Sequence, residues 1–416
     1  MKYLKMVLKT IFSGVIIGVI IGLYQRLAQI LNNLSQNIYY NPSSLNYLFM
    51  VILAVILFII ANYISKKAFC VAGSGIPYVE LTVEHKWNLK YYLALPAIFV
   101  NSLIAFFFGL SLGSEGPSAT MGACLGLITN KIFKDDDTDT IKASMGAGFG
   151  CAFLAPLAGI VYTIENSYKK GLSVILIIKT IITVLSAIII TRLINNHKII
   201  KIDIENGFLF QDYLIIIVIS IMTLLISIIF IKGIISLKDF LDKYKTNNIV
   251  QNRLIFIFLI FIALGFLIPS QVGGGVNTIN FLLNRNIFNI SFSVLVFLLT
   301  LKLFLTIICA NAKISGGLLI PTLAIGAITG ALIYKLFMPF LSNDVLYLCI
   351  LLSMLSLFAY TTKLPLTAIC LAINFASYKI VLLPMVIIMI ILSIFRYFVK
   401  TESIYEELKK RIRVAN

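Results

Sequence analysis

The sequence is short of charge. Only 12% of its 416 residues are Asp, Glu, Lys or Arg, about half the share that is usual in soluble globular proteins, whereas 60% are hydrophobic. A soluble fold could not bury so much apolar surface, so the composition indicates a polytopic membrane protein. The long apolar runs are continuous rather than alternating, which favours spanning helices over a closed barrel.

Acidic residues are scarcer than basic ones. There are 17 against 34, which gives a formal net charge of 34 − 17 = +17. The basic residues gather at the ends of apolar runs, where they set membrane orientation, so the excess does not indicate nucleic-acid binding. Clusters near the N-terminus, at Lys66–Lys67 and in the tail from Lys409 predict that both termini are cytoplasmic. We expect a multi-pass protein of the plasma membrane.

Residues that bind metals or form disulfides are also few. The chain has two histidines, and its six cysteines are scattered without CxxC spacing. We therefore expect the cysteines to be small buried hydrophobes, and we predict no metal site and no cofactor. The acidic stretch "DDDTD" at 135–139 is expected to be a solvated loop that caps the following helix.

Eight apolar runs are long enough to predict spanning helices. They lie at about 10–24, 47–65, 91–112, 171–192, 209–232, 253–268, 290–310 and 380–398. Four further apolar stretches are interrupted by Gly and Pro and are expected not to be simple spans; they lie at 115–129, 142–166, 318–338 and 344–378. Broken helices at membrane depth are tolerated only where they line a cavity or are buried in protein, so these stretches point to a transport site.

The chain also matches itself. "PLAGIVYTIENSYK" begins at Pro156 and "PLTAICLAINFASYK" at Pro365, an offset of 365 − 156 = 209. Pro117 and Pro321, each four residues after a glycine, are related by nearly the same offset, 321 − 117 = 204. We interpret the chain as a single transmembrane domain with two related halves, 1–200 and 201–416. Such halves are typical of secondary transporters and of channels derived from them.

Three glycine-rich breaks precede helical segments: "GSGIP" at 73–77, "GSEGP" at 113–117 and "GGLLIP" at 316–321. Proline suits the first turn of a helix, and glycine lets the preceding backbone turn sharply and approach a ligand. Each break therefore presents a helix N-terminus, and three of them converging would bind an anion without a full positive charge. The residues that support these breaks are Gly73, Pro77, Gly113, Gly116, Pro117, Gly316, Gly317 and Pro321.

Glu115 is a carboxylate at one of these helix N-termini, inside otherwise apolar sequence. An ionised Glu115 would occupy the anion position and block it, whereas a protonated one would swing away. Intramembrane carboxylates are functional by default, so we expect Glu115 to be a gate and a carrier of protons.

The three motifs, in this order and spacing, resemble the signature of the CLC family of chloride channels and transporters. "CAFLAPLAGIVYTIE", "PSQVGGGVN" and "KLPLTAICLAINFASYKIVLLPM" resemble it too, and the likeness covers nearly the whole chain. It implies an all-α bundle of two inverted repeats with re-entrant helices, a homodimer, and no cytosolic regulatory domain. It also implies that Glu115 is the gate. The chloride-binding residues that it implies are Ser74, Gly75, Ile76, Leu318, Leu319 and Tyr405.

The chain departs from the family pattern at several positions. Ser114 stands where the second motif carries Lys or Arg, which lowers the local positive potential, and Leu319 replaces an aromatic residue. Asn166 falls on the inner proton glutamate of many members, so Glu165 or water would have to take over the proton path. The presence of Ser74 favours chloride or a similar anion over fluoride.

The favoured function is proton-coupled chloride exchange gated by Glu115. The alternative is a passive chloride channel gated by voltage or pH, because Asn166 cannot titrate. Two other classes are weaker: a serine hydrolase built on Ser74 lacks a histidine within a clear span, and a cation-coupled carrier of organic anions would need an intramembrane basic residue that holds the carboxylate. The expected partners are chloride, with other halides and nitrate as alternatives, protons, the lipid bilayer and a second copy of the chain.

Overall fold

The computed structural model describes residues 2–68, 72–168, 171–196, 200–202, 204, 207–208, 210–244, 247–284, 290–342, 345–399 and 401–412. These residues fold mainly into helices, and the described part of the chain contains isolated β-bridges but no strand. Among the described residues, eight helices are long and apolar enough to cross a membrane. The prediction of an all-α polytopic membrane protein is therefore confirmed.

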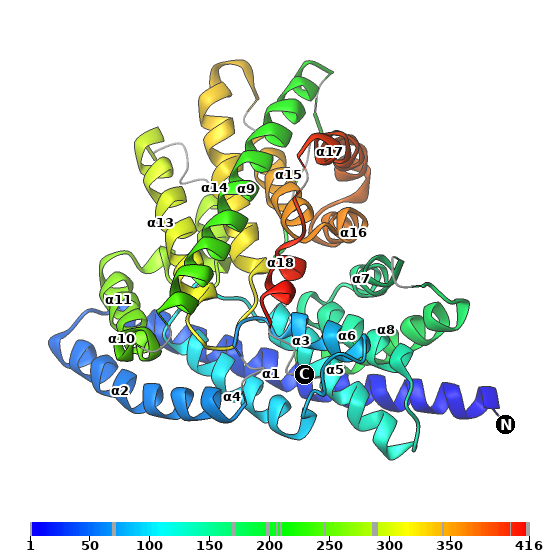
Figure 1. Cartoon of the computed structure of the whole chain (residues 1–416). Coiled ribbons are helices and arrows are strands. Elements are labelled where there is room, and N and C mark those ends of the chain that lie inside the picture. Colours follow the sequence, from blue (N-terminus) through cyan, green and yellow to red (C-terminus); the bar gives the residue numbers. More distant parts are fainter. Residues whose placement is uncertain are drawn as a thin grey trace.

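The first half forms a layer that lies at the bottom of Figure 1, with α1 running along it. Its helices are α1 (Lys2–Tyr40), α2 (Ser44–Lys67), α3 (Ile76–Val83), α4 (Tyr91–Phe107), α5 (Glu115–Ile132), α6 (Thr138–Phe153), α7 (Pro156–Tyr168) and α8 (Val174–Ile194).

The second half stands above this layer in Figure 1, and the short C-terminal helix lies between the two. Its α-helices are α9 (Ile215–Lys243), α10 (Asn248–Gln251), α11 (Arg253–Leu267), α12 (Val276–Leu283), α13 (Phe292–Ala310), α14 (Leu319–Phe337), α15 (Val345–Thr362), α16 (Pro365–Phe375), α17 (Tyr378–Phe398) and α18 (Ile404–Lys410). The 3₁₀ turns are η2 (Phe210–Leu214), η3 (Pro269–Gln271) and η5 (Met338–Phe340).

Small residues let the central helices of each half pack closely. A methyl group on Gly122 of α5 would collide with the backbone of α6 at Ser144, and one on Gly330 of α14 would collide with α15 at Cys349. Helices in membranes associate through such close backbone contacts, because lipid offers no hydrophobic driving force between them. The pairs α5–α6 and α14–α15 therefore form the cores of the two halves.

For two of the four stretches, the prediction that they are broken is wrong in part. Residues 319–337 and 345–362 form the uninterrupted helices α14 and α15, each long enough to span a membrane. The proline and glycines of α14 do not break it, because Pro321 lies in the first turn and the glycines serve packing. Helix α15 contains no Gly or Pro, and the nearby Pro365 begins α16. Conversely, the runs at 91–112 and 253–268 form the shorter helices α4 and α11, which end at Phe107 and at Leu267, two residues before Pro269.

The breaks at 142–166 and 344–378 have the same backbone geometry. Leu154, between α6 and α7, has φ +51°, and Lys363, between α15 and α16, has φ +62°. Both are left-handed residues without being glycine, which is uncommon. They are separated by 363 − 154 = 209 residues, the offset that relates Pro156 to Pro365.

The acidic stretch at 135–139 caps α6 as expected, since the Asp137 carboxylate accepts a hydrogen bond from the Asp139 amide. It is not simply solvated, however. Asp137 pairs with Lys179 of α8 at 2.6 Å and with Lys9 of α1 at 3.4 Å. Burial alone would raise the pKa of Asp137, but hydrogen bonds from Lys179 and Thr140 and the two lysine charges lower it to about 2.

Candidate anion site

The three glycine-rich breaks meet at the centre of the molecule. The amide of Gly73 donates to Ile314 O at 2.9 Å, and the amide of Gly316 donates to Gly73 O at 3.0 Å. Gly113 and Gly317 exchange two backbone hydrogen bonds, of 2.8 and 2.6 Å. The first and second motifs are thus joined to the third by main-chain pairing between the halves.

The contact between these breaks leaves no room for side chains. A methyl group on Gly116 would lie 2.9 Å from the Cα atom of Gly317 and 2.9 Å from the Cβ atom of Ser74. One on Gly317 would lie 2.7 Å from the Gly116 amide nitrogen. Because real Cβ atoms do not approach this closely, glycine at both positions sets the distance between the helix N-termini of α5 and α14.

The carboxylate of Glu115, at the N-terminus of α5, reaches across this contact to the N-terminus of α14. Its Oε1 accepts hydrogen bonds from the amides of Leu319, at 2.6 Å, and Ile320, at 3.2 Å, at the N-terminus of α14. Glu115 is 1% exposed, and its Oε2 has no hydrogen-bond partner among the described residues. A helix N-terminus binds anions through its unpaired N–H groups, and here the bound anion is a side chain of the chain itself.

The other sequence-predicted residues surround this contact. Ser74 is buried, its carbonyl accepts from the Thr120 hydroxyl at 2.7 Å, and its own hydroxyl lies 3.4 Å from the Ile76 amide. Gly75 has φ +75° and begins α3, which fits glycine at that turn. The supporting and neighbouring residues Gly73, Ile76, Pro77, Pro117, Leu318 and Pro321 lie in the same three breaks.

Tyr405 is contributed by α18, the helix that lies between the two layers. It is 7% exposed and is close enough to Glu115 to interact with it electrostatically. Tyr162 of α7 and Glu80 of α3 are also close enough to Tyr405 to interact with it electrostatically. Tyr405 therefore links the region of Glu115 to side chains that the sequence did not single out.

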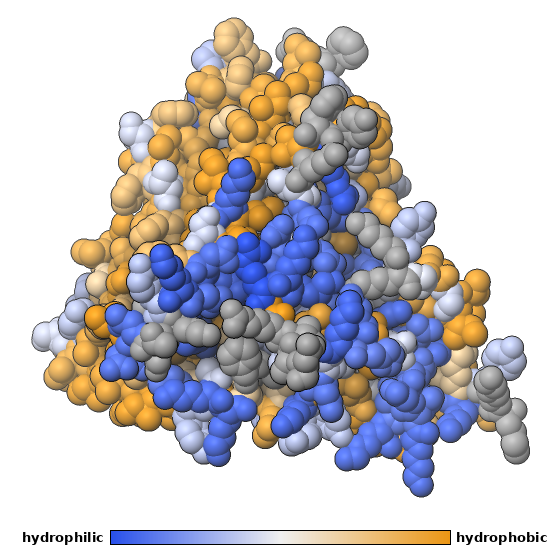
Figure 2. Space-filling model, in the orientation of Figure 1, coloured by the Kyte–Doolittle hydropathy of each residue, from blue (hydrophilic) through white to orange (hydrophobic). Residues whose placement is uncertain are grey.

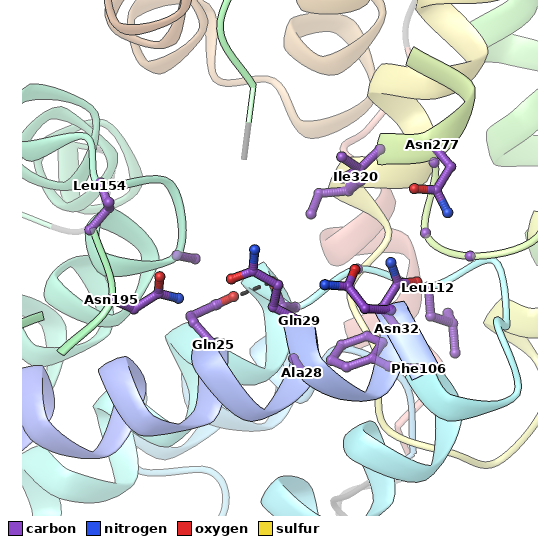
Figure 3. Close-up of a pocket in the computed structure, with 18 of the residues that line it drawn as sticks. Gln25, Ala28, Gln29, Asn32, Phe106, Leu112, Leu154, Asn195, Asn277 and Ile320 are labelled. Carbon is purple, nitrogen blue, oxygen red and sulfur yellow. Dashed lines mark hydrogen bonds between the residues drawn. The ribbon is translucent and has the colours of Figure 1, made fainter. Parts of the chain in front are cut away.

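A cavity of about 380 Å³ opens beside Glu115, and we call it the amide pocket (Figure 3). Gly113, Ser114 and Ile320 line it next to the gate candidate, and none of its described lining residues is charged. Seven of them carry carboxamides: Gln25, Gln29, Asn32, Asn33, Asn195, Asn277 and Asn280.

Ser114, which stands where the family pattern has a cation, is hydrogen-bonded to Gln25. The Nε2 group of Gln25 donates to the Ser114 hydroxyl at 3.1 Å and to the Ser118 hydroxyl at 3.0 Å. Neutral amides thus stand where a charge was expected. They could not be found from sequence, because they come from α1, the end of α8 and α12, which are far apart along the chain.

A second, smaller cavity of about 40 Å³ lies between α3, α6 and α7, and we call it the Glu80 cavity. Its polar lining residues are Glu80, Lys142, Tyr162, Thr163, Asn166 and Ser167. Lys142 and Met145 are in the first half of α6, whereas Cys151 and Ala152 at its other end line the amide pocket. The two cavities therefore lie at opposite ends of α6.

Glu165 does not line either cavity. Its carboxylate accepts hydrogen bonds from the amides of Leu366 and Thr367, at 3.0 and 2.9 Å, and from the Thr367 hydroxyl at 2.7 Å. It therefore caps the N-terminus of α16, and it is its neighbour Asn166 that faces the cavity. The described residues also contain no group of three His, Cys, Asp or Glu that could hold a metal ion.

Residues 57–395 match the model of the voltage-gated chloride channel family. The chain belongs to this CLC family. Among curated proteins it is 27% identical over 352 residues to the H(+)/Cl(-) exchange transporter ClcA of Vibrio cholerae serotype O1, covering 82% of this chain and 74% of the relative. ClcA of Vibrio campbellii is 28% identical over 370 residues, 86% of this chain and 78% of the relative.

Solved CLC structures have the same fold. A slow cyanobacterial Cl⁻/H⁺ antiporter matches with a TM-score of 0.88 at 23% identity, covering 98% of this chain and 97% of that one. A CLC-type fluoride/proton antiporter matches with a TM-score of 0.80 at 20% identity, covering 97% of each chain. As a CLC member, the protein serves chloride transport in a membrane and is not an enzyme.

Proposed function

We propose that this CLC protein exchanges chloride for protons and that Glu115 is its gate. The observation that carries the proposal is the Glu115 carboxylate bound to the amides of Leu319 and Ile320. A carboxylate in this position takes the place of a permeating anion. Protonation removes its charge and weakens both hydrogen bonds, so the side chain leaves and an anion can enter.

Chloride would then be held by Ser74, Gly75, Ile76, Leu318, Leu319 and Tyr405, as the family resemblance implies. The helix N-termini offer N–H groups and partial positive charge rather than a full cation. Such a site binds an anion and still lets it leave, which conduction requires. Bromide and nitrate are candidates for the same site, because the site recognises charge and size rather than a specific shape.

The passive channel remains the second candidate function, and the observation that favours it is Asn166, which cannot titrate. Exchange is preferred because the curated relatives carry that activity in their names.

We further propose two inverted halves, 1–200 and 201–416, in one domain, supported by the 209-residue offset between Leu154 and Lys363. A homodimer in the plasma membrane with cytoplasmic termini completes the proposal, on the family resemblance and the basic clusters.

The test is proton flux into proteoliposomes driven by a chloride gradient. Wild type should move protons uphill, and Glu115→Gln should stop proton movement while chloride still passes. Glu402→Gln, which changes an acid of the C-terminal segment outside the site, serves as the matched control. Chloride flux without proton movement in wild type would favour the channel, and no chloride flux from folded protein would refute both.

A further inference from the structure

We propose that Glu80 is the inner proton-transfer residue of this protein and takes the place of Asn166. The inference rests on the proposed proton-coupled exchange and names the group that receives protons on the side opposite the amide pocket. It follows from what lines the Glu80 cavity and from what lies between that cavity and Glu115.

Glu80 and Asn166 face the same cavity from different helices. Glu80 comes from α3 and Asn166 from α7, and the hollow between them measures about 40 Å³. That volume is large enough for a water molecule with polar partners. The carboxylate that α7 lacks at position 166 is therefore supplied to the same space by α3.

Two buried tyrosines, Tyr162 and Tyr405, interact electrostatically with Glu80, and Tyr405 also interacts with Glu115. The Tyr162 ring stacks on Phe149 with centroids 4.3 Å apart, and its buried hydroxyl has no conventional hydrogen bond among the described residues. Glu80 and Asn166 are close enough to interact with Tyr162, and Tyr405 interacts with Tyr162, Glu80 and Glu115. These electrostatic interactions group Glu80, Tyr162, Tyr405 and Glu115 in one part of a largely apolar core, and we assign the proton route to them.

The transfer balances without any other reactant. The protonated carboxyl of Glu80 gives its proton to a hydroxyl or a water molecule, which releases a different proton toward the Glu115 carboxylate. Glu80 ends ionised and Glu115 ends protonated, and the hydroxyls between them are unchanged. Protonated Glu115 then leaves the amides of Leu319 and Ile320.

Glu80 can exchange protons with water. Its side chain is 14% exposed, and hydrophilic residues gather over the middle of the face in Figure 2, where α3 and α18 lie in Figure 1. The Lys409 ammonium contacts Glu80 at 3.2 Å, Glu84 at 3.2 Å and Glu406 at 2.8 Å. Lys409 is thus shared by three carboxylates, and Glu84 also pairs with Lys86 at 3.1 Å. The charged and titratable groups around Glu80 include Glu84, Lys86, Lys142, Tyr162, Tyr405, Glu406 and Lys409.

Glu165 is a poorer candidate for this role. Both of its oxygens accept hydrogen bonds from the N-terminus of α16, and it does not line the Glu80 cavity. These hydrogen bonds hold the carboxylate at the helix end and away from the cavity. It has no polar route to Glu115 through the contacts described above.

The experiment compares the ratio of proton to chloride flux in proteoliposomes. Glu80→Gln should lower this ratio by at least about tenfold, the scale expected when a positioned proton-transfer group is lost. Glu84→Gln is the matched control, because Glu84 shares Lys409 at the same distance but does not line the cavity. It should keep the wild-type ratio. The double variant Glu80→Gln, Asn166→Glu returns a carboxylate to the cavity and should recover coupling.

The outcomes separate the two proposals. If wild type couples protons and Glu80→Gln still couples them, the role of Glu80 is refuted and the exchange function stands. If wild type moves no protons, both are refuted. Should Glu80→Gln fail to fold, Glu80→Gln combined with Lys409→Gln removes the pair together, and the same loss of coupling is expected. Retained coupling in that double variant would overturn the proposal.

Discussion

The amide pocket and the Glu80 cavity lie toward opposite ends of α6, and they differ in size and chemistry. The first is about 380 Å³, and its described lining carries amides and no charge. The second is about 40 Å³ and contains Glu80 and Lys142. Amides donate N–H groups and do not titrate, so they suit a partly dehydrated anion. Carboxylates titrate, so the narrow cavity suits protons. In the proposed exchange, this difference would give chloride the amide pocket and protons the Glu80 cavity.

The largest effect is expected from disturbing the close contact between Gly116 and Gly317, where the two halves meet beside Glu115. Gly116→Ala places a methyl group 2.9 Å from the backbone of Gly317, so the halves must separate. We expect loss of chloride flux and destabilisation of about 1–3 kcal/mol, measured by thermal unfolding in detergent. Gly207→Ala, where the nearest atom to the new methyl group is 3.8 Å away, is the control and should behave as wild type. Normal transport by Gly116→Ala would contradict the role assigned to this contact.

A cation at the amide pocket should make it a stronger anion site. Ser114→Arg places a guanidinium beside the Glu115 carboxylate and breaks the hydrogen bond from Gln25. An added charge at short range in a wet pocket contributes about 1 kcal/mol, roughly a fivefold gain in chloride affinity, which calorimetry would measure. Ser114→Gln supplies length without charge and should show no gain. Equal affinities for the two variants would mean that charge does not limit binding.

An acidic residue in the amide pocket should lower the rate of chloride uptake without directly changing proton transfer. Asn277→Asp adds a negative charge at the start of α12, and the initial rate of chloride uptake should fall by about two- to fivefold at low salt. The deficit should shrink at high ionic strength, because exposed charges are screened. Asn41→Asp, on an exposed residue outside the pocket, is the control. An unchanged rate for Asn277→Asp would place the anion route elsewhere.

The smallest effect on transport is expected at Asp137, which ties α6 to α1 and α8 near the Glu80 cavity. Its folded-state pKa, about 2, lies below the unfolded value, so its contribution to stability is complete above about pH 4 and is lost as the pH falls toward 2. At neutral pH, Asp137→Asn should cost about 2 kcal/mol of stability and leave the flux ratio unchanged. Unfolding midpoints across this pH range would test it, and a variant with the same pH dependence as wild type would contradict it.

Much of the fold could be predicted because membrane helices are specified by local hydrophobicity, as α2, α8 and α13 illustrate. The error at α14 arose because its Gly and Pro serve packing and the first helical turn rather than a break, and the error at α15 because the break lies after the helix, just before Pro365. The three motif breaks were recognisable, since each combines glycine, proline and a helix start within a few residues. Glu80 lies three residues after the end of the first of these motifs, and the scarcity of acids was a signal that could have drawn attention to it. The amide pocket had no such signal, because its residues are neutral and come from separate helices.

The pairing of Gly113 with Gly317, and of Glu115 with Leu319, has a consequence for how such a protein can be divided. Each half contributes what the other lacks: one supplies the carboxylate, and the other supplies the amides that hold it. A fragment that ends near residue 200 would contain the acid without its amides, and the complementary fragment would contain the amides without the acid. Neither piece would carry a complete ion site, so conduction should return only when both are present in one membrane and associate.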